Sequence, residues 1–467
     1  MQWRKLVMNA GRLLSKQENR NNEVPLTKQD DDAVNDDSGS SVEKLGDAPV
    51  SATPKSRQGR KRDKPHYIAQ FPTLVDLVEH NGQPAFLVTN EIGLEITTNV
   101  MIDGQVCVPP PREKIPWELL KAEDVIAVYE AENELHPQAA DKALFEDVKT
   151  HLKAVSELPH EDYYDLNAAW VLHTYTMENF SYSPIILLFG VPEMGKSRTG
   201  KGMIYLAYRG LHVESLREAY LLRVAQNLNA TLFIDVMDVW KTAEHANTTD
   251  VLLSRFERGG TVPRVIFPDR GAFEDTVYYE VFGATIIGTN RAVGSILETR
   301  TIQINMRASS RRFDNEVTPA LAIPLRLRLL AFRARHLGQT LPDIAKPCAG
   351  RLGDIIKPLF QIIQLVSPHR QAVLERLLKQ IEIDRLADKA ETFEAVVVSA
   401  ILLLRPKVRN GSLPFKEITS ELNKDKGDNY KVPPQKVGRT IKSLGIHTGR
   451  NTGTGGSAIL WDEDQLE

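Results

Sequence analysis

The stretch GVPEMGKS at 190–197 decides the fold of this chain. It follows an apolar run at 185–189 and precedes a segment, 201–208, whose pattern predicts a helix. Strand, G-x-x-x-x-G-K-S and helix in this order predict a phosphate-binding loop, because the glycines let backbone N–H groups face a polyphosphate. The alternative is a chance match in a glycine-bearing turn, and the flanking elements argue against it. The residues expected to bind the nucleotide are Gly190, Val191, Pro192, Glu193, Met194, Gly195, Lys196 and Ser197.

Two residue types in this pattern carry the phosphate chemistry. The Lys196 ammonium is expected to reach the outer phosphates, and the Ser197 hydroxyl is expected to be a ligand of Mg²⁺. A second apolar run, 230–235, ends in Asp235, whose carboxylate suits the water shell of the same ion. Ser197 and Asp235 are therefore the predicted metal-binding pair.

The order of the segments after the loop predicts an α/β fold with a parallel sheet. Apolar strands at 284–289 and 301–306 alternate with helical segments, and the first of them runs into Asn290. The ends of parallel strands meet at one edge of a sheet, so Asn290 is expected near the phosphates or the attacking water. A simple turn asparagine is the alternative.

The length, net charge and cysteine content of the chain narrow the class of protein to which it can belong. Its 467 residues carry a net charge of −3, and its two cysteines, Cys107 and Cys348, lie far apart, which argues against a disulfide framework or a zinc site. No apolar run approaches the ~20 residues of a membrane span. The basic start at 1–14 lacks the long apolar region of a secretory signal. We therefore expect a cytoplasmic protein without a membrane partner.

Composition and pattern divide the chain into six segments. The prediction is a disordered polar tail at 1–64, a small β-rich domain at 65–135 and a helical brace at 139–182. The phosphate-loop core follows at 183–310, then a helical lid with connector at 311–390 and a terminal domain at 391–467. The β-rich segment suggests no chemistry. The helix expected at 324–335 carries four arginines, most of which are expected in solvent.

The pattern of the last segment predicts two helices followed by a glycine-rich hairpin, which is the order of elements in a winged helix. Between 405 and 452 eleven Lys and Arg face four Asp and Glu, although the chain as a whole is slightly acidic. A cationic domain of this kind suits contacts with DNA phosphates, and a solvated basic face used for protein contacts is the alternative. The residues expected to bind DNA are Lys436, Arg439, Lys442 and Arg450.

With the loop, the Asp235 strand and the Asn290 strand in this order, the chain resembles the AAA+ class of P-loop ATPases. More narrowly, 183–461 resembles the ATPase and winged-helix module of bacterial, phage and plasmid primase–helicase proteins. The resemblance implies ATP and Mg²⁺ as cofactors, Asn290 as a sensor, and Arg300 as an arginine that reaches the neighbouring subunit of a hexameric ring. The catalytic set it implies is Lys196, Asp235, Asp238, Asn290 and Arg300.

One position departs from the family pattern. The family usually has a water-activating glutamate directly after the metal-binding aspartate, whereas this chain has Val236. Either Asp238 polarises the water, or another acid such as Glu244 does, or hydrolysis is slow; Asp238 is the preferred candidate. No primase-like acidic constellation is visible upstream.

The leading hypothesis is an ATP-driven oligomeric motor, a helicase or translocase, acting on single-stranded or forked DNA in replication or mobile-element maintenance. An ATP-gated DNA-binding regulator with little hydrolysis is the second, and Val236 favours it. A kinase is the third, although no acceptor site is recognisable. The sequence does not determine the polarity of movement, the DNA preference, the ring size, the catalytic base, the role of 65–135 or the pathway.

Overall fold

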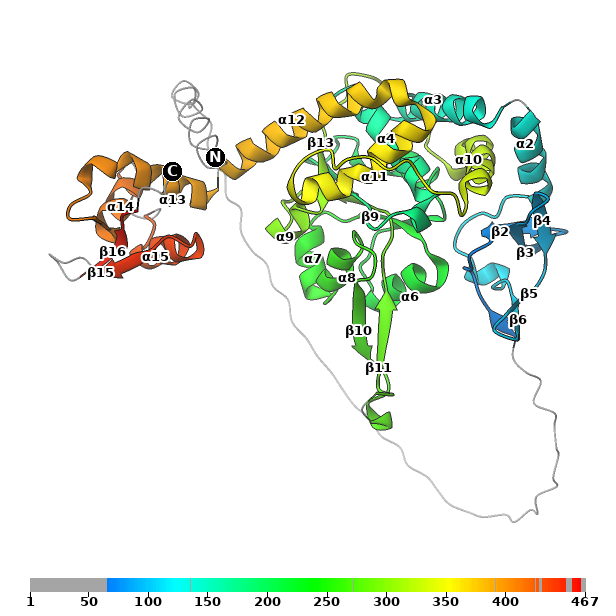
Figure 1. Cartoon of the computed structure of the whole chain (residues 1–467), viewed down its shortest axis with the longest axis horizontal. Coiled ribbons are helices and arrows are strands. Elements are labelled where there is room, and N and C mark those ends of the chain that lie inside the picture. Colours follow the sequence, from blue (N-terminus) through cyan, green and yellow to red (C-terminus); the bar gives the residue numbers. More distant parts are fainter. Residues whose placement is uncertain are drawn as a thin grey trace, which may run out of the picture. The chain divides into compact units, whose positions relative to one another are not determined.

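The computed structural model of the chain describes residues 65–134, 136–271, 273–390, 392–424, 426–427, 431–450 and 456–462 (Figure 1). The tail expected to be disordered, 1–64, lies outside these residues. Contacts divide the chain into two compact units, Asp63–Lys379 and a second unit that includes Gln380–Glu467. Among the described residues, none of the helices is both long and apolar enough to cross a bilayer.

The larger unit is built on a five-stranded parallel sheet, which confirms the expected α/β class. Its strand order is β13-β7-β12-β9-β8, and the strands span Thr301–Asn305, Ile185–Phe189, Thr285–Thr289, Thr231–Asp235 and Gly210–Val213. Strand β12 lies between the strand that precedes the phosphate loop and the strand that ends in Asp235. The register pairs Thr289 with Phe189 and Gly288 with Asp235. The carboxyl ends of β7, β12 and β9 therefore meet at one edge.

The helix that follows the phosphate loop starts earlier than its sequence pattern predicts. Helix α5 spans Lys196–Ile204, whereas the pattern placed it at 201–208. Gly195, with φ of 77°, is the residue before the helix, and its left-handed backbone lets the chain turn from loop to helix within one residue. The other helices of the core are α6, α7, α8 and α9, at Glu218–Leu228, Val239–His245, Thr249–Ser254 and Ser295–Glu298.

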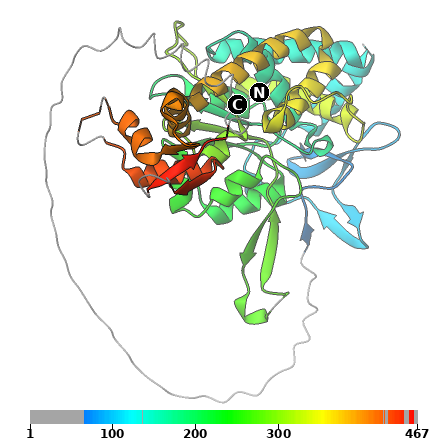
Figure 2. The same ribbon diagram turned by 60° about the vertical axis from the view of Figure 1, so that its left-hand side comes forward.

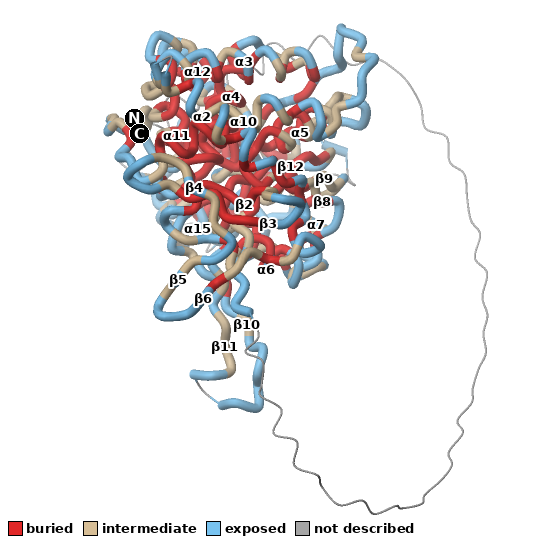
Figure 3. Tube along the Cα trace, turned by 90° about the vertical axis from the view of Figure 1, so that its right-hand side faces the viewer, coloured by how far each residue is buried: buried red, intermediate tan, exposed pale blue. Residues whose placement is uncertain are grey.

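Helices on the amino-terminal side brace the strand that leads into the loop. They are α2, α3 and α4, at Ala122–Glu134, Pro137–Val155 and Asp162–Thr174. Helix α4 is buried along its whole length, and the Trp170 Nε1–H donates to the Pro184 carbonyl at 3.0 Å, one residue before β7. His173 is fully buried beside the Ser183 hydroxyl, at 3.0 Å, so it packs in the core. The buried residues gather around α4, α11 and the central sheet (Figure 3).

The helices that follow the core pack back onto this brace. They are α10, α11 and α12, at Ile323–His336, Gly350–Val366 and Gln371–Ala390. Arg333 and Arg335 of α10 are only 4% and 8% exposed, so the expectation of solvated arginines is wrong for both. Arg335 forms ion pairs with Asp141, at 2.6 Å, and Glu132, at 2.9 Å. These acids of α2 and α3 provide the charge that lets Arg335 be buried, whereas Arg333 is paired with Glu178.

Two small sheets precede the helices. Strands β2, β3 and β4 form an antiparallel sheet at Leu74–His80, Gln83–Thr89 and Leu94–Thr97. Strands β1, β6 and β5 form the other, at His66–Tyr67, Gln105–Val108 and Val100–Ile102. Asp76 of β2 receives a hydrogen bond from Arg209 Nε at 2.7 Å, which joins this part of the chain to the segment between α5 and β8.

A two-stranded hairpin projects from the core between β9 and β12 (Figure 2). Strand β10, Thr261–Val265, pairs antiparallel with β11, Thr276–Glu280. The hairpin and its turn expose Val265, Phe267, Phe273 and Tyr278, and the Arg270 guanidinium stacks on the Phe267 ring at 3.8 Å. The returning strand β11 is not among the strands that the sequence pattern predicts.

Beyond the end of α12, the described part of the smaller unit contains helices and a small sheet. The helices are α13, α14 and α15, at Phe393–Leu403, Phe415–Leu422 and Pro434–Ser443. The antiparallel sheet has the order β14-β16-β15, with strands at Ser412–Pro414, Ser457–Leu460 and Thr448–Arg450. Its core is formed by apolar side chains that include Val397, Ile401, Leu413, Ile418, Val437, Ile441 and Ile459.

Candidate nucleotide site and candidate DNA interface

The phosphate loop runs from β7 to α5 and is shaped by its backbone. Gly190 and Gly195 have φ of 159° and 77°, and Glu193 has φ of 68°. A Cβ at Gly190 would lie 3.2 Å from the Met306 carbonyl oxygen, so the loop passes close to the end of β13. The glycines thus permit both the turn and this close approach.

Lys196 is the buried cation of the loop. It is 7% exposed, and its Nζ donates to the carbonyls of Gly190, at 2.8 Å, and Val191, at 2.6 Å. Burial lowers the pKa of Lys196, and the charge of Asp235 opposes that shift. An ammonium that faces carbonyls inside a loop lacks a full counter-charge, and a phosphate oxygen would supply one. The residues present therefore fit a nucleoside polyphosphate.

Asp235 stands at the end of β9 beside the loop. Burial works to raise its pKa, but the His212 and Ser197 side chains outweigh it, so the pKa of Asp235 lies below its ordinary value. The carboxylate is therefore ionised at neutral pH, as a metal ligand must be. The structure brings Ser197 and Asp235 together, as the sequence predicts for the metal site.

His212 is a residue of this site that the sequence analysis missed. It lies on β8, and its ring stacks on the Phe233 ring with the two ring centres 4.9 Å apart. Its Nε2 is 3.7 Å from Asp235 Oδ2. The side chain is 16% exposed, so it restricts the water on that side of Asp235. The sequence alone does not reveal this residue, because helix α6 separates β8 from β9 along the chain. Only the order of the strands in the sheet places His212 next to Asp235.

Asn290 follows β12, the strand between the loop and Asp235. Its backbone N–H donates to the Met237 carbonyl at 2.9 Å, and the neighbouring Thr289 hydroxyl donates to the same oxygen at 3.0 Å. The ends of β12 and β9 are thereby tied together. The Asn290 amide group makes no hydrogen bond to any other described residue, so it is available to a ligand at this edge.

Asp238, the preferred candidate for the base, begins helix α7. Its Oδ1 accepts a hydrogen bond from the Lys241 backbone N–H at 3.2 Å, which is the contact of a helix N-cap. The carboxylate is half-buried, and its second oxygen makes no bond within the described chain. Glu244, the other candidate, is exposed farther along the same helix. Val236 lies between these acids and Asp235, and its N–H donates to the Gly288 carbonyl at 3.1 Å.

Arg300 lies at the opposite end of the sheet from the phosphate loop. It immediately precedes β13, whose first residue pairs with Ile185 at the start of β7. Its Nη1 donates to the Ile296 carbonyl at 2.5 Å, and its guanidinium stacks on Phe256 at 4.8 Å. Burial and the charge of Arg351 lower the pKa of Arg300. The structure therefore does not bring Arg300 to the nucleotide site of its own chain.

A cationic groove crosses the smaller unit between α14, α15 and β16. It has a volume of about 1020 Å³ and is lined by four cations, Lys416, Lys431, Arg439 and Lys442, without an acid among the described lining residues. Two of the four predicted DNA-binding residues, Arg439 and Lys442, therefore line the groove. Lys436 instead lies over the Phe393 ring of α13, at 4.6 Å, and Arg450 ends β15.

Comparison with solved structures finds low-identity likenesses. A full-length MCM homolog from Methanopyrus kandleri is 13% identical, with 63% of this chain and 72% of that chain covered and a TM-score of 0.35. An SCCmec type IV Cch helicase is 12% identical, with 81% and 79% covered and a TM-score of 0.32. The C-terminal region of NrS-1 is 11% identical, with 83% and 96% covered and a TM-score of 0.34. No family model and no curated protein matches the chain. The chemistry of the site therefore rests on its own residues.

Proposed function

We propose that this protein is an ATP-driven oligomeric DNA motor, a helicase or translocase. The observation that carries the proposal is the convergence of Lys196, Ser197 and Asp235 at the carboxyl edge of the parallel sheet. MgATP bound there would supply an electrophilic phosphorus atom and a metal that neutralises developing charge. Lys196 would hold the outer phosphates, and Ser197 with Asp235 would hold the metal.

Two further residues complete the proposed catalytic set. Asn290, whose amide is free at the end of β12, would orient the attacking water or sense the terminal phosphate. The free oxygen of Asp238 would accept the proton of that water, while the other oxygen caps α7. His212 would position Asp235 from the edge strand.

Arg300 would act on the neighbouring subunit. Its place at the far end of the sheet separates it from its own phosphate loop, and an arginine in that place can serve only a site in another copy. The proposal thus includes a closed ring, a hexamer, in which each site receives its arginine from the next subunit.

The contact with DNA would involve two surfaces. The smaller unit has the helix, helix and hairpin order of a winged helix, and its groove offers the cations Arg439 and Lys442 to phosphates. The β10–β11 hairpin offers exposed aromatic rings, Phe267 and Phe273, on which bases of a single strand would stack.

Steady-state hydrolysis of ATP, with and without single-stranded or forked DNA, tests the motor. We expect DNA to stimulate turnover and Lys196→Ala to abolish it, with Lys201→Ala of the same helix as the matched control. Stimulation that is retained in Lys196→Ala, or the absence of any DNA effect, would contradict the proposal.

The salt dependence of duplex binding tests the groove. Each phosphate contact that is removed should reduce the slope of log K against log salt concentration by about 0.9. We expect the double variant with Arg439→Ala and Lys442→Ala to reduce this slope by roughly twice that amount. Lys436→Ala serves as the comparison, since that ammonium lies over Phe393 and should change the slope less.

A regulator that binds ATP but scarcely hydrolyses it is the second candidate. The observations that favour it are Val236 in place of an acid and the helix-capping bond of Asp238. Near-zero turnover together with ATP-dependent DNA binding would make this the better account.

A further inference from the structure

The indole of Trp240 packs against Gly294, beyond the carboxyl ends of β9 and β12. Trp240 lies in the first turn of α7, two residues after Asp238, and is half-buried. A Cβ at Gly294 would lie 2.6 Å from Cε2 and from Cζ2 of this ring. The backbone of Gly294 has φ of −59°, which any residue can adopt, so glycine is needed here for space and not for conformation. The contact is therefore a close fit between α7 and the segment that leads into α9.

On one side, this contact adjoins the candidate nucleotide site. The Met237 carbonyl accepts hydrogen bonds from the Asn290 N–H, at 2.9 Å, and from the Thr289 hydroxyl, at 3.0 Å. Asp238 is the next residue, and it begins α7. The first turn of α7 is thus joined to the strand end that carries Asn290, and a movement of this edge moves the Trp240 indole with it.

On the other side, the contact leads to Arg300. Gly294 precedes α9, and its carbonyl accepts hydrogen bonds from the backbone N–H groups of Leu297, at 2.9 Å, and Glu298, at 3.0 Å. The Arg300 N–H donates to the Leu297 carbonyl at 2.9 Å. The Arg300 Nη1 donates to the Ile296 carbonyl at 2.5 Å. Gly294, α9 and Arg300 therefore form one hydrogen-bonded unit.

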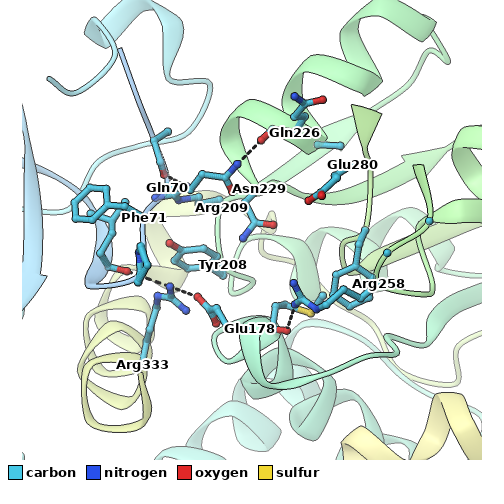
Figure 4. Close-up of a pocket in the computed structure, with 18 of the residues that line it drawn as sticks. Gln70, Phe71, Glu178, Tyr208, Arg209, Gln226, Asn229, Arg258, Glu280 and Arg333 are labelled. Atoms are coloured by element: carbon cyan, nitrogen blue, oxygen red, sulfur yellow. Dashed lines mark hydrogen bonds and ion pairs between the residues drawn. The ribbon is translucent and has the colours of Figure 1, made fainter. Parts of the chain in front are cut away.

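A second support of Arg300 belongs to the packed core. The Arg300 guanidinium carbon lies 4.8 Å from the centre of the Phe256 ring, which is buried. Two residues farther on, Arg258 donates to the carbonyls of Met177, at 2.7 Å, and Phe180, at 2.9 Å (Figure 4). Phe256 is thus held by the core, whereas α9 is the support of Arg300 that contacts the edge of the nucleotide site.

We propose that Trp240 is a positioning residue that couples the nucleotide site of each subunit to the arginine that the same subunit offers to its neighbour. The indole transmits a shift of Asp238 and Asn290 to Gly294, and α9 transmits it to Arg300. This inference rests on the proposed ring, because Arg300 serves a site only in another copy. It adds a link between successive sites, so that hydrolysis in one subunit changes the arginine available to the next.

Mixing two variants separates a loss in trans from a loss at the variant's own site. We expect Trp240→Ala to lower kcat by about ten- to a hundredfold with little change in the KM for ATP, since a catalytic group misplaced by ~1 Å can cost that much. In a 1:1 mixture with the inactive Lys196→Ala, about a quarter of the interfaces of a closed ring join a Trp240→Ala site to an Arg300 that is held correctly. The mixture should therefore turn over faster than Trp240→Ala alone. A defect confined to the variant's own site would give about half the turnover of Trp240→Ala alone and would overturn the proposal.

The mixture of Arg300→Ala with Lys196→Ala shows whether a failure concerns the coupling or the ring. If that mixture recovers turnover and the Trp240→Ala mixture does not, the coupling is wrong and the ring stands. If neither recovers, the ring fails, and the coupling fails with it. His245→Ala, at an exposed position of α7, is the matched control and should be fully active.

Melting temperatures test the contact without any activity. Gly294→Ala places a methyl group against the indole, so we expect it to lower the melting temperature of the wild-type protein and to change that of Trp240→Ala much less. Equal effects in the two backgrounds would overturn the proposal. Trp240→Phe keeps a flat ring at this position and should retain most of the turnover.

The fluorescence of Trp240 tests whether the nucleotide site reaches the indole. The difference between the emission of wild type and of Trp240→Phe isolates this indole from the other tryptophans of the chain. We expect MgADP to change the difference spectrum while binding both proteins with the same affinity. Bound MgADP with an unchanged difference spectrum would overturn the coupling alone, whereas a failure of MgADP to bind would overturn the proposed function together with it.

Discussion

At the scale of single residues, Asp238 caps α7 and is the proposed general base, and one pair of substitutions separates these two roles. Asparagine caps a helix about as well as aspartate, whereas alanine does not. We expect Asp238→Asn to keep the wild-type melting temperature while turnover falls by about 10²-fold or more, the usual contribution of a general base. Asp238→Ala should lose about 1 kcal/mol of stability as well. If Asp238→Asn retains full turnover, Asp238 is only a cap and Glu244→Gln becomes the next variant to measure.

Glu157 gives a pH-dependent prediction. Its carboxylate accepts hydrogen bonds from the hydroxyls of Ser309 and Ser310, at 2.6 and 2.7 Å, and from the backbone N–H groups of Ser310 and Arg311. These bonds lower the pKa of Glu157 to about 2. A carboxyl pKa that is depressed in the folded state stabilises it above the unfolded pKa, and the effect disappears as the pH falls toward the folded pKa.

The stability difference between wild type and Glu157→Gln should therefore be constant above about pH 5 and should shrink as the pH falls below ~4.5. Urea unfolding at a series of pH values from 7 to 3 measures this difference. A difference of the same size at pH 3 and pH 7 would show that the carboxylate does not hold the segment after β13.

At the scale of elements, the contact between α5 and β9 sets how closely the loop helix approaches the sheet. A Cβ at Gly200 would lie 2.1 Å from Cζ of Phe233, a ring that is itself fully buried. We expect Gly200→Ala to destabilise the protein by about 1–3 kcal/mol through overpacking, despite its better helix propensity. Adding Phe233→Leu should recover part of that loss. Lys201→Ala is the control on the same helix, and an unchanged melting temperature for Gly200→Ala would contradict this packing.

The elements also show how far pattern alone reaches. The strands β7, β9, β12 and β13 were predictable, because apolar runs bounded by polar residues mark buried parallel strands. Strand β11 was missed although Thr276–Glu280 is rich in strand-forming Thr, Val and Tyr, because the turn that joins it to β10 is long and has no short hairpin signal. The start of α5 was placed late because the pattern of the helix is weak over the residues that also form the loop.

At the scale of the whole molecule, the proposed closed ring predicts that two inactive variants complement each other when they are mixed. Lys196→Ala should remove the proposed phosphate contact of its own site, whereas Arg300→Ala should remove the arginine of the neighbouring site. In a 1:1 mixture, about a quarter of the interfaces of a closed ring regain both groups. We expect the mixture to recover a corresponding share of wild-type turnover, and Arg312→Ala, in an exposed arginine, to be fully active. No recovery in the mixture, with oligomers present, would place Arg300 outside catalysis.

The sequence by itself determined the turn at 190–197, because a short local pattern places its glycines, Lys196 and Ser197 together. It also determined the α/β class of the fold, because the spacing of apolar residues differs between strands and helices. Tertiary structure alone decided which distant residues meet. The strand order brings His212 beside Asp235, and packing against the acids of α2 and α3 buries Arg335. Folding also buries Arg209, whose side chain binds Asp76 and the carbonyls of Ala69 and Leu228. Such contacts depend on the energy of the whole packed core, which no local pattern contains.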